Sequence, residues 1–207
     1  HLEQHLDRID HDRYRLLMKV MKAKDSILPI IDLTDREREH YEANYYHMYG
    51  FLFLRDGAIF MPHEVRERLL QVDTSQLLPK LDRNQEWIQL TRGLLYYYGN
   101  MGAQGLVEKV EHVTGQKVDF WEYWYIIRDL EPYDYSVLVS EYGFSHFTVD
   151  NPQLIAQEHR NRPQLDYYPV TKAQALRAAD DDYVDRPPDS NNLCTLTGKI
   201  GRRRPIC

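Results

Sequence analysis

The sequence predicts a mostly α-helical protein with short β-hairpins, arranged as tandem winged-helix-like modules. Helical periodicity recurs along most of the 207 residues. Two segments instead alternate around a tight turn, GFLFLRDGAIFMP at 50–62 and YSVLVSEYGFSHFTV at 135–149. Three helical segments followed by a two-stranded hairpin is the element order of a winged-helix domain. We therefore expect each hairpin to be a wing that covers the open end of a small helical bundle.

The first module is expected over residues 1–72. Apolar side chains at helical spacing predict a helix over 9–23, with acidic residues at its start and lysines at its end. The apolar run SILPII follows and contains Pro29. Because proline cannot donate a ladder hydrogen bond, this run is either an edge strand or an extended connection.

Local signals define the rest of this module. Thr34 and Glu37 form the capping-box pattern and predict a helix start, and Gly50 suits the end of that helix. The hairpin then turns at Asp56–Gly57. Pro62 suits the first position of a closing helix.

A polar stretch at 73–84, DTSQLLPKLDRN, is expected to be a linker to the second module at 85–163. The glycines of GNMGAQG at 99–105 are interpreted as a turn between helices. The helices expected in this module are QEWIQLTRGLLYYYG, MGAQGLVEKVEHVTG and DFWEYWYIIRDL before the hairpin, and NPQLIAQEHR after it.

Residues 164–186 predict a short helical extension that starts at Thr171. The Asp180–Asp182 run within it is interpreted as solvated, the alternative being a magnesium site. Residues 187–207 have no periodicity and are expected to form a flexible basic tail.

Composition restricts the class of protein. The chain is 43% hydrophobic with a mean hydropathy of −0.63, and it has no apolar run of membrane-spanning length. No signal peptide is visible, so a cytoplasmic location without membrane association is expected. Cys194 and Cys207 lie in the polar tail and are expected to be free thiols. The net charge of −6 argues against non-specific coating of nucleic acid.

Two stretches, LTRGLLYYYG and NRPQLDYYPVTKAQALRAADDDYVDRPP, resemble a poorly characterised family of bacterial, mainly Firmicute, proteins. Members often join an N-terminal segment like that of the Rho termination factor to a C-terminal SEC-C zinc-chelating motif. The resemblance covers roughly Ile9 to Pro187 and implies no biochemical activity. The Rho-like segment is absent here, so its nucleic-acid associations do not transfer.

The tail KIGRRRPIC resembles only the opening of a SEC-C motif. Ile206 stands where the first zinc cysteine belongs, and Cys207 falls one place late. A closed structural zinc site needs about four nitrogen or sulfur ligands. We therefore predict no metal and no cofactor.

No catalytic constellation is visible, so the protein is expected not to be an enzyme. His63–Glu64 lacks the second histidine of a zinc-protease helix, and GFSHF lacks the glycines of a nucleophile elbow. The loosely spaced glycines of 99–105 follow no predicted strand, so they do not form a phosphate loop. His146 and His112 are expected at the surface.

The sixteen tyrosines and the aromatic helix at 119–130 point toward protein contacts. The candidate partner-binding residues are Trp121 and Tyr125 of this helix and Tyr142 in the loop of the second hairpin; the alternative is that they close the core of the module. That helix carries Asp119, Glu122 and Asp129 against Arg128, a balance that disfavours duplex phosphate. We therefore expect a protein-interaction module whose partner is unknown.

The alternative function is a DNA- or RNA-binding regulatory protein. It would use the winged-helix modules together with the basic tail, where the positive residues are Lys199, Arg202, Arg203 and Arg204. Three neighbouring arginines give modest, salt-sensitive affinity. Nucleic acid therefore stays possible but is disfavoured by charge.

Overall fold

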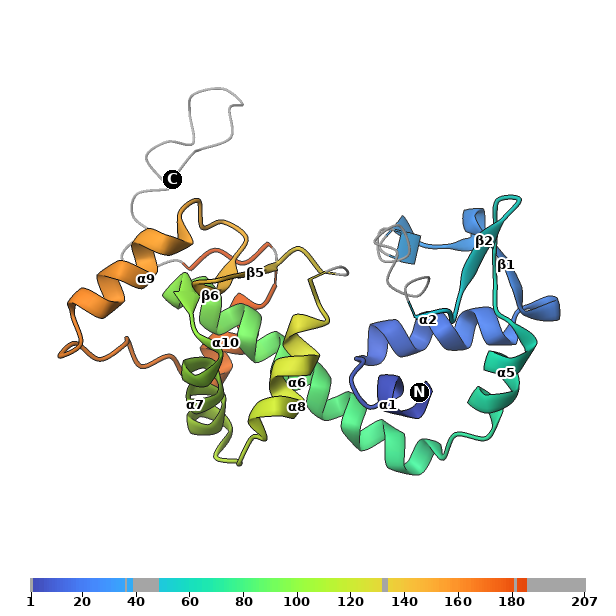
Figure 1. The fold of residues 1–207 in the computed structure, drawn as a ribbon, viewed down its shortest axis with the longest axis horizontal. Coiled ribbons are helices and arrows are strands. Elements are labelled where there is room, and N and C mark those ends of the chain that lie inside the picture. Colours follow the sequence, from blue (N-terminus) through green and yellow to red (C-terminus); the bar gives the residue numbers. More distant parts are fainter. Residues whose placement is uncertain (1, 36, 39–48, 132–133, 181, 186–207) are drawn as a thin grey trace, which may run out of the picture.

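A computed structural model describes residues 2–35, 37–38, 49–131, 134–180 and 182–185 (Figure 1). Within these ranges the α-helices are α1 (Leu2–Leu6), α2 (His11–Lys22), α5 (His63–Leu70), α6 (Thr74–Tyr98), α7 (Ala103–Thr114), α8 (Phe120–Arg128), α9 (Pro152–Asn161) and α10 (Lys172–Ala178). The strands are β1 (Ile27–Pro29), β2 (Phe53–Arg55), β3 (Ala58–Phe60), β4 (Asn100–Met101), β5 (Val137–Ser140) and β6 (Gly143–His146). The mostly helical class with short antiparallel strands is confirmed.

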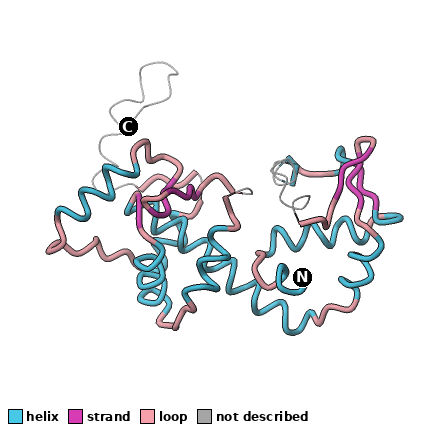
Figure 2. Tube along the Cα trace, in the orientation of Figure 1, coloured by secondary structure: helices cyan, strands magenta, loops and turns pink. Residues whose placement is uncertain are grey.

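The strands form two separate sheets, each with three strands, which Figure 2 shows in magenta at opposite sides of the molecule. Their orders are β1-β3-β2 and β4-β6-β5, so in both sheets the strand that comes first in the chain pairs with the last strand of the hairpin. All pairings are antiparallel. The two expected hairpins are present, and each gains a third strand.

The first unit, α1 to α5, follows most of its local sequence signals. Asp10 caps α2 by accepting the backbone N–H of Arg13 at 2.9 Å. The capping box forms as expected, because Glu37 accepts the N–H of Thr34 at 2.8 Å and donates its own N–H to the threonine hydroxyl. The helix predicted to continue from there lies largely outside the described residues.

The first hairpin turns where the sequence indicates. Asp56 and Gly57 have φ of 51° and 74°, which is the pair of positive values that a type I′ turn requires. The SILPII run contributes β1, an edge strand that ends at Pro29, so the edge-strand alternative is the one observed.

The predicted linker at 73–84 is wrong. These residues form the first half of α6, a 25-residue helix that joins the two units and crosses the centre of Figure 1. Asp73 caps the helix by accepting the N–H of Ser75 at 3.0 Å. Pro79 lies within the first turns of the helix and is exposed. Buried Leu77 and Leu81 show that this half packs against the core.

The second unit comprises the second half of α6 and continues to α9. Its helices α7, α8 and α9 match the predicted segments, with Asp119 and Asn151 as N-caps of the last two. The interpretation of 99–105 as a plain turn was incomplete, because Asn100 and Met101 pair with β6 as strand β4. A two-residue strand leaves no alternating pattern to recognise.

The C-terminal extension packs along α6. Thr171 and Gln174 form a capping box at the start of α10. A Cβ atom on Gly93 of α6 would lie 1.8 Å from the carbonyl oxygen of Ala175, so the two helices approach with no room between their backbones. The Tyr98 hydroxyl also donates to the Tyr168 carbonyl at 2.8 Å. The tyrosine clusters of α6 and of the extension therefore meet in the folded chain.

Candidate interaction surface

Helix α8 is apolar on two faces. Its inner face buries Tyr123, Ile126 and Ile127 completely. Tyr123 is held against α6, where its hydroxyl lies 2.6 Å from that of Thr91. These residues fill the core of the second unit. Of the aromatic side chains on the other face, Trp124 packs partly against that core, whereas Trp121 and Tyr125 are exposed.

The outer face carries a row that we call the aromatic stripe: Trp121, Trp124 and Tyr125, followed by Arg128. Their spacing of three, four and seven residues places them on one side of the helix. Trp121 is 62% exposed and Tyr125 37% exposed. The rings lie close together, with centroids 6.4 Å apart for Trp121 and Tyr125 and 5.3 Å for Trp124 and Tyr125.

Arginine side chains stack on the stripe. The Arg128 guanidinium lies 4.8 Å from the centre of the Trp124 ring, and that of Arg8 lies 4.3 Å from the centre of the Tyr125 ring. Arg8 belongs to the first unit. Such stacking is favourable because the ring face is electron-rich, and it leaves the N–H groups at the guanidinium edge open for other contacts.

One carboxylate of α8 is compensated by a basic side chain, so the helix is less negative than its sequence indicates. Glu122 pairs with Arg83 of α6 at 2.8 Å. Asp119 is engaged as the helix cap, accepting the N–H of Glu122 at 2.8 Å. Glu122 is therefore charge-compensated, whereas Asp119 keeps its exposed negative charge.

Asp129 follows α8 and is partly buried toward the first unit. Burial raises the pKa of its carboxyl, and the positive charges of Arg13 and Arg8 and a hydrogen bond from Tyr49 oppose that rise. The C-terminal end of α8 is thus an intramolecular contact between the two units. A helix held in this way is not free along its whole length to enter a DNA groove.

Tyr142, the third predicted contact residue, does not join the stripe. It lies at the tip of the hairpin of β5 and β6, is half-buried, and interacts with Glu141 and electrostatically with Arg160 of α9. The structure therefore brings Trp121 and Tyr125 together and places Tyr142 elsewhere. Sequence reasoning missed Trp124 and Arg8.

The histidines occupy mixed environments. His112 is exposed, as expected, but His146 is 8% exposed and its prediction as a surface residue was wrong. Its ring packs against Tyr96 and Phe147, and its Nδ1 lies 2.8 Å from the Thr148 hydroxyl. Within the described part of the chain, no group of three His, Cys, Asp or Glu side chains is arranged to hold a metal ion.

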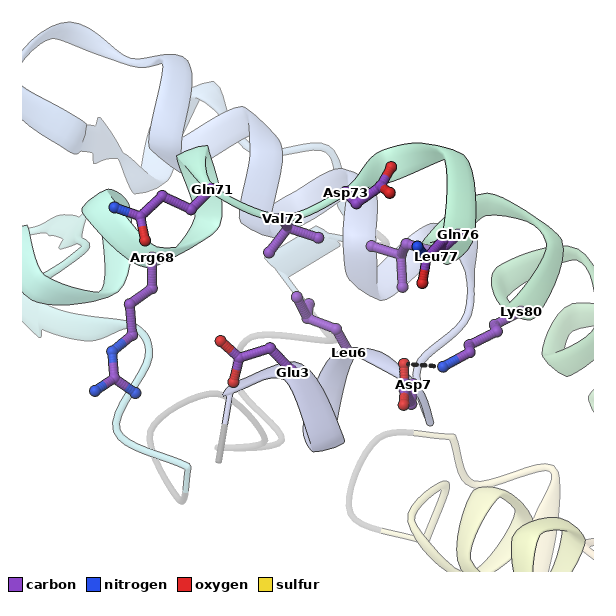
Figure 3. A pocket seen from close by; sticks show the side chains of 10 residues that line it. All are labelled: Glu3, Leu6, Asp7, Arg68, Gln71, Val72, Asp73, Gln76, Leu77 and Lys80. Carbon is purple, nitrogen blue, oxygen red and sulfur yellow. Dashed lines mark ion pairs between the residues drawn. The ribbon is translucent and has the colours of Figure 1, made fainter.

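A pocket of about 370 Å³ lies between α1, the end of α5 and the start of α6 (Figure 3). Its apolar floor includes Leu6, which points toward Val72 in the figure. Asp7 and Lys80 pair at 2.8 Å along its wall. Because the wall mixes acidic side chains with Arg68 and Lys80, the pocket presents no concentrated charge of one sign for a ligand.

The basic residues of the alternative function, Lys199 and Arg202 to Arg204, lie outside the described residues. No helix in the described portion has the length and apolar character needed to cross a membrane. No family model, curated protein or solved structure matches the chain. The resemblance to the SEC-C-associated family therefore stays a prediction.

Proposed function

We propose that the protein is a non-enzymatic protein-interaction module and that the aromatic stripe of α8 is its contact surface. The proposal depends on one observation: α8 has a buried apolar face and also an exposed aromatic face. A helix that is apolar all round is normally buried on all sides, yet Trp121 keeps 62% of its surface in solvent. Large exposed aromatic groups beside arginine are the residues enriched at the energetic centres of protein interfaces.

The proposal includes the winged-helix-like architecture. Both units place a helix, a strand and further chain before a hairpin, and both sheets share one strand order. This repeat supports two related modules side by side. In the second unit α8 is the helix directly before the wing, the position that duplex-binding members of such folds use for recognition. Fold alone does not assign function, so the proposed contact depends on the surface of α8.

The chain offers a matched control for a test of this surface. We expect Trp121→Ala to lose a protein partner in affinity capture from the source cells, since truncation removes the largest exposed apolar group of the stripe. Tyr135→Ala, at an aromatic residue that is 73% exposed and lies outside α8, is expected to keep that partner. Capture that is identical for both variants and for the unchanged protein would reject the proposal.

Nucleic-acid binding is the second candidate, and the stacked arginines and aromatic rings favour single strands over duplex. Bases stack on aromatic side chains without sequence preference. We would measure binding of duplex and single strands at about 20 mM and about 150 mM salt. Affinity that falls steeply with salt and disappears on removal of residues 199–207 would support this candidate over protein contact.

A further inference from the structure

We infer that the aromatic stripe binds a short acidic segment of a partner protein, with an apolar side chain of that segment placed on Trp121. This inference rests on the proposed function and narrows the class of partner. It follows from the length of α8, the charge beside the stripe and the exposure of Trp121.

The length of α8 favours a short segment. The helix has nine residues and is therefore about 14 Å long at 1.5 Å per residue. A stable interface between two folded chains buries about 800 Å² on each side, spread over about 20 residues or more. The stripe has four residues, and Arg8 and Tyr49 of the first unit lie at its C-terminal end. A peptide segment fits this area, whereas a second copy of the chain needs a larger surface.

The charge beside the stripe favours acidic groups. Arg8 and Arg128 each stack on one of its rings, and neither makes an ion pair with another described residue. Glu122 is already paired with Arg83. Asp129 interacts electrostatically with Arg13, Arg8 and, more weakly, Arg128, and exposed Glu131 lies one turn beyond the helix. One carboxylate, Asp129, thus faces both guanidinium groups without an ion pair to either, and their remaining N–H groups can bind further carboxylates by charge-assisted hydrogen bonds.

Trp121 is the reason to expect an apolar side chain in the partner segment. Its ring is the most exposed of the stripe and lies next to Phe120, whose centroid is 5.2 Å away. Covering this ring removes apolar surface from water and anchors the segment, while the arginines fix its position along α8. An acidic segment without an apolar anchor would bind only through salt-sensitive charge pairs.

The test is a selection from a displayed random library of peptides of about twelve residues, carried out on the whole chain. We expect enriched peptides to combine aspartate or glutamate with an aromatic or aliphatic residue. Binding of the best peptide is expected to fall at least about tenfold in the double variant Arg8→Gln and Arg128→Gln, and also in Trp121→Ala. Arg160→Gln, at an exposed arginine of α9, is expected to bind like the unchanged protein. Circular dichroism of each variant shows whether it is folded.

The outcomes separate the two proposals. Enriched peptides that require Trp121 but carry no excess of acidic residues would overturn the inference and leave the proposed function in place. A library with no Trp121-dependent peptide would overturn both. Binding of an oligothymidylate of about twenty nucleotides at the stripe, or a Trp121-dependent dimer in sedimentation, would also overturn the acidic-segment inference.

Discussion

Gly93 is the residue that sets how closely the C-terminal extension packs on α6. Any side chain there meets the backbone of α10 at Ala175, where no rotamer change gives relief. The hydroxyl of Tyr98 and the ion pair of Lys172 with Glu86 hold the same two segments together. A methyl group at position 93 therefore requires α10 to move away from α6.

We expect Gly93→Ala to lower the free energy of unfolding by about 1–3 kcal/mol, as overpacking does. The helix-forming tendency of alanine, worth about 1 kcal/mol, offsets only part of this loss. Urea denaturation measures the change. Gly102→Ser is the control, since space around Gly102 is open and serine suits its N-cap position. An unfolding midpoint unchanged in Gly93→Ala would show that the helices are not in backbone contact.

His5 gives the stability of the first unit a dependence on pH. Its buried ring packs between Tyr49 and Phe51, at centroid distances of 4.1 and 4.8 Å. Burial, reinforced by the charges of Arg13 and Arg8, lowers the pKa of His5 from 6.5 to about 3. The unfolded chain therefore binds a proton between these pH values that the folded chain does not.

Because the folded pKa is depressed, the stabilising contribution of neutral His5 is fully present above pH 6.5 and is lost as pH falls toward 3. The expected slope is about 1.4 kcal/mol per pH unit for one proton. We expect His5→Phe to reduce the slope of unfolding free energy between pH 6.5 and 4.5 by this amount. Denaturant titrations at several pH values measure it, and equal slopes in both proteins would contradict the assignment to His5.

At the scale of elements, the main difference between structure and sequence-based prediction is α6, whose first half was predicted to be a linker. Residues 73–84 contain Pro79 and many polar groups, which indicate a linker when considered alone. In the folded chain Leu77 and Leu81 are buried, and that burial outweighs the proline.

We expect Pro79→Ala to stabilise the protein by up to about 3 kcal/mol, because alanine restores a helical N–H and removes the ring from the helix. Pro79 is exposed, so little packing is lost. Chemical denaturation gives the stability change, and amide hydrogen exchange over 75–84 gives its location. A flexible linker would instead lose stability slightly on this substitution, since proline restricts the unfolded chain.

Local signals in the sequence predicted the elements that they cap or turn. The capping box at Thr34, the helix start at Thr171, the Asp119 cap and the Asp56–Gly57 turn depend on a few neighbouring residues, and each is present. Strand β4 was missed because two residues are too few for an alternating pattern.

The candidate surface was only partly predictable. Trp121 and Tyr125 follow from the composition of one helix. The pairing of Glu122 with Arg83 and the stacking of Arg8 on Tyr125 join residues 39 and 117 positions apart, respectively. Such contacts depend on how whole elements pack, which local patterns do not encode. The sequence therefore overstated the negative character of α8.

At the scale of the whole molecule, Asn84 connects the two units. It is fully buried in α6, and its side-chain N–H₂ donates to the carbonyl oxygens of Asp7 and Ile9 at 2.9 and 2.8 Å. We expect Asn84→Ala to cost about 1–3 kcal/mol for each carbonyl left buried without its donor. Gln89→Ala on the same helix is the control, and an equal small effect of both variants would show that the units are not joined through Asn84.

The arrangement of the units leaves the aromatic stripe open to a partner while the first unit covers one end of it. A photo-cross-linking amino acid at position 121, with position 135 as the control, tests this in the source cells. We expect one discrete cross-linked protein from position 121 and none from position 135. Cross-linking that is equal at the two positions, or absent at position 121, would contradict the assignment of α8 as the contact surface.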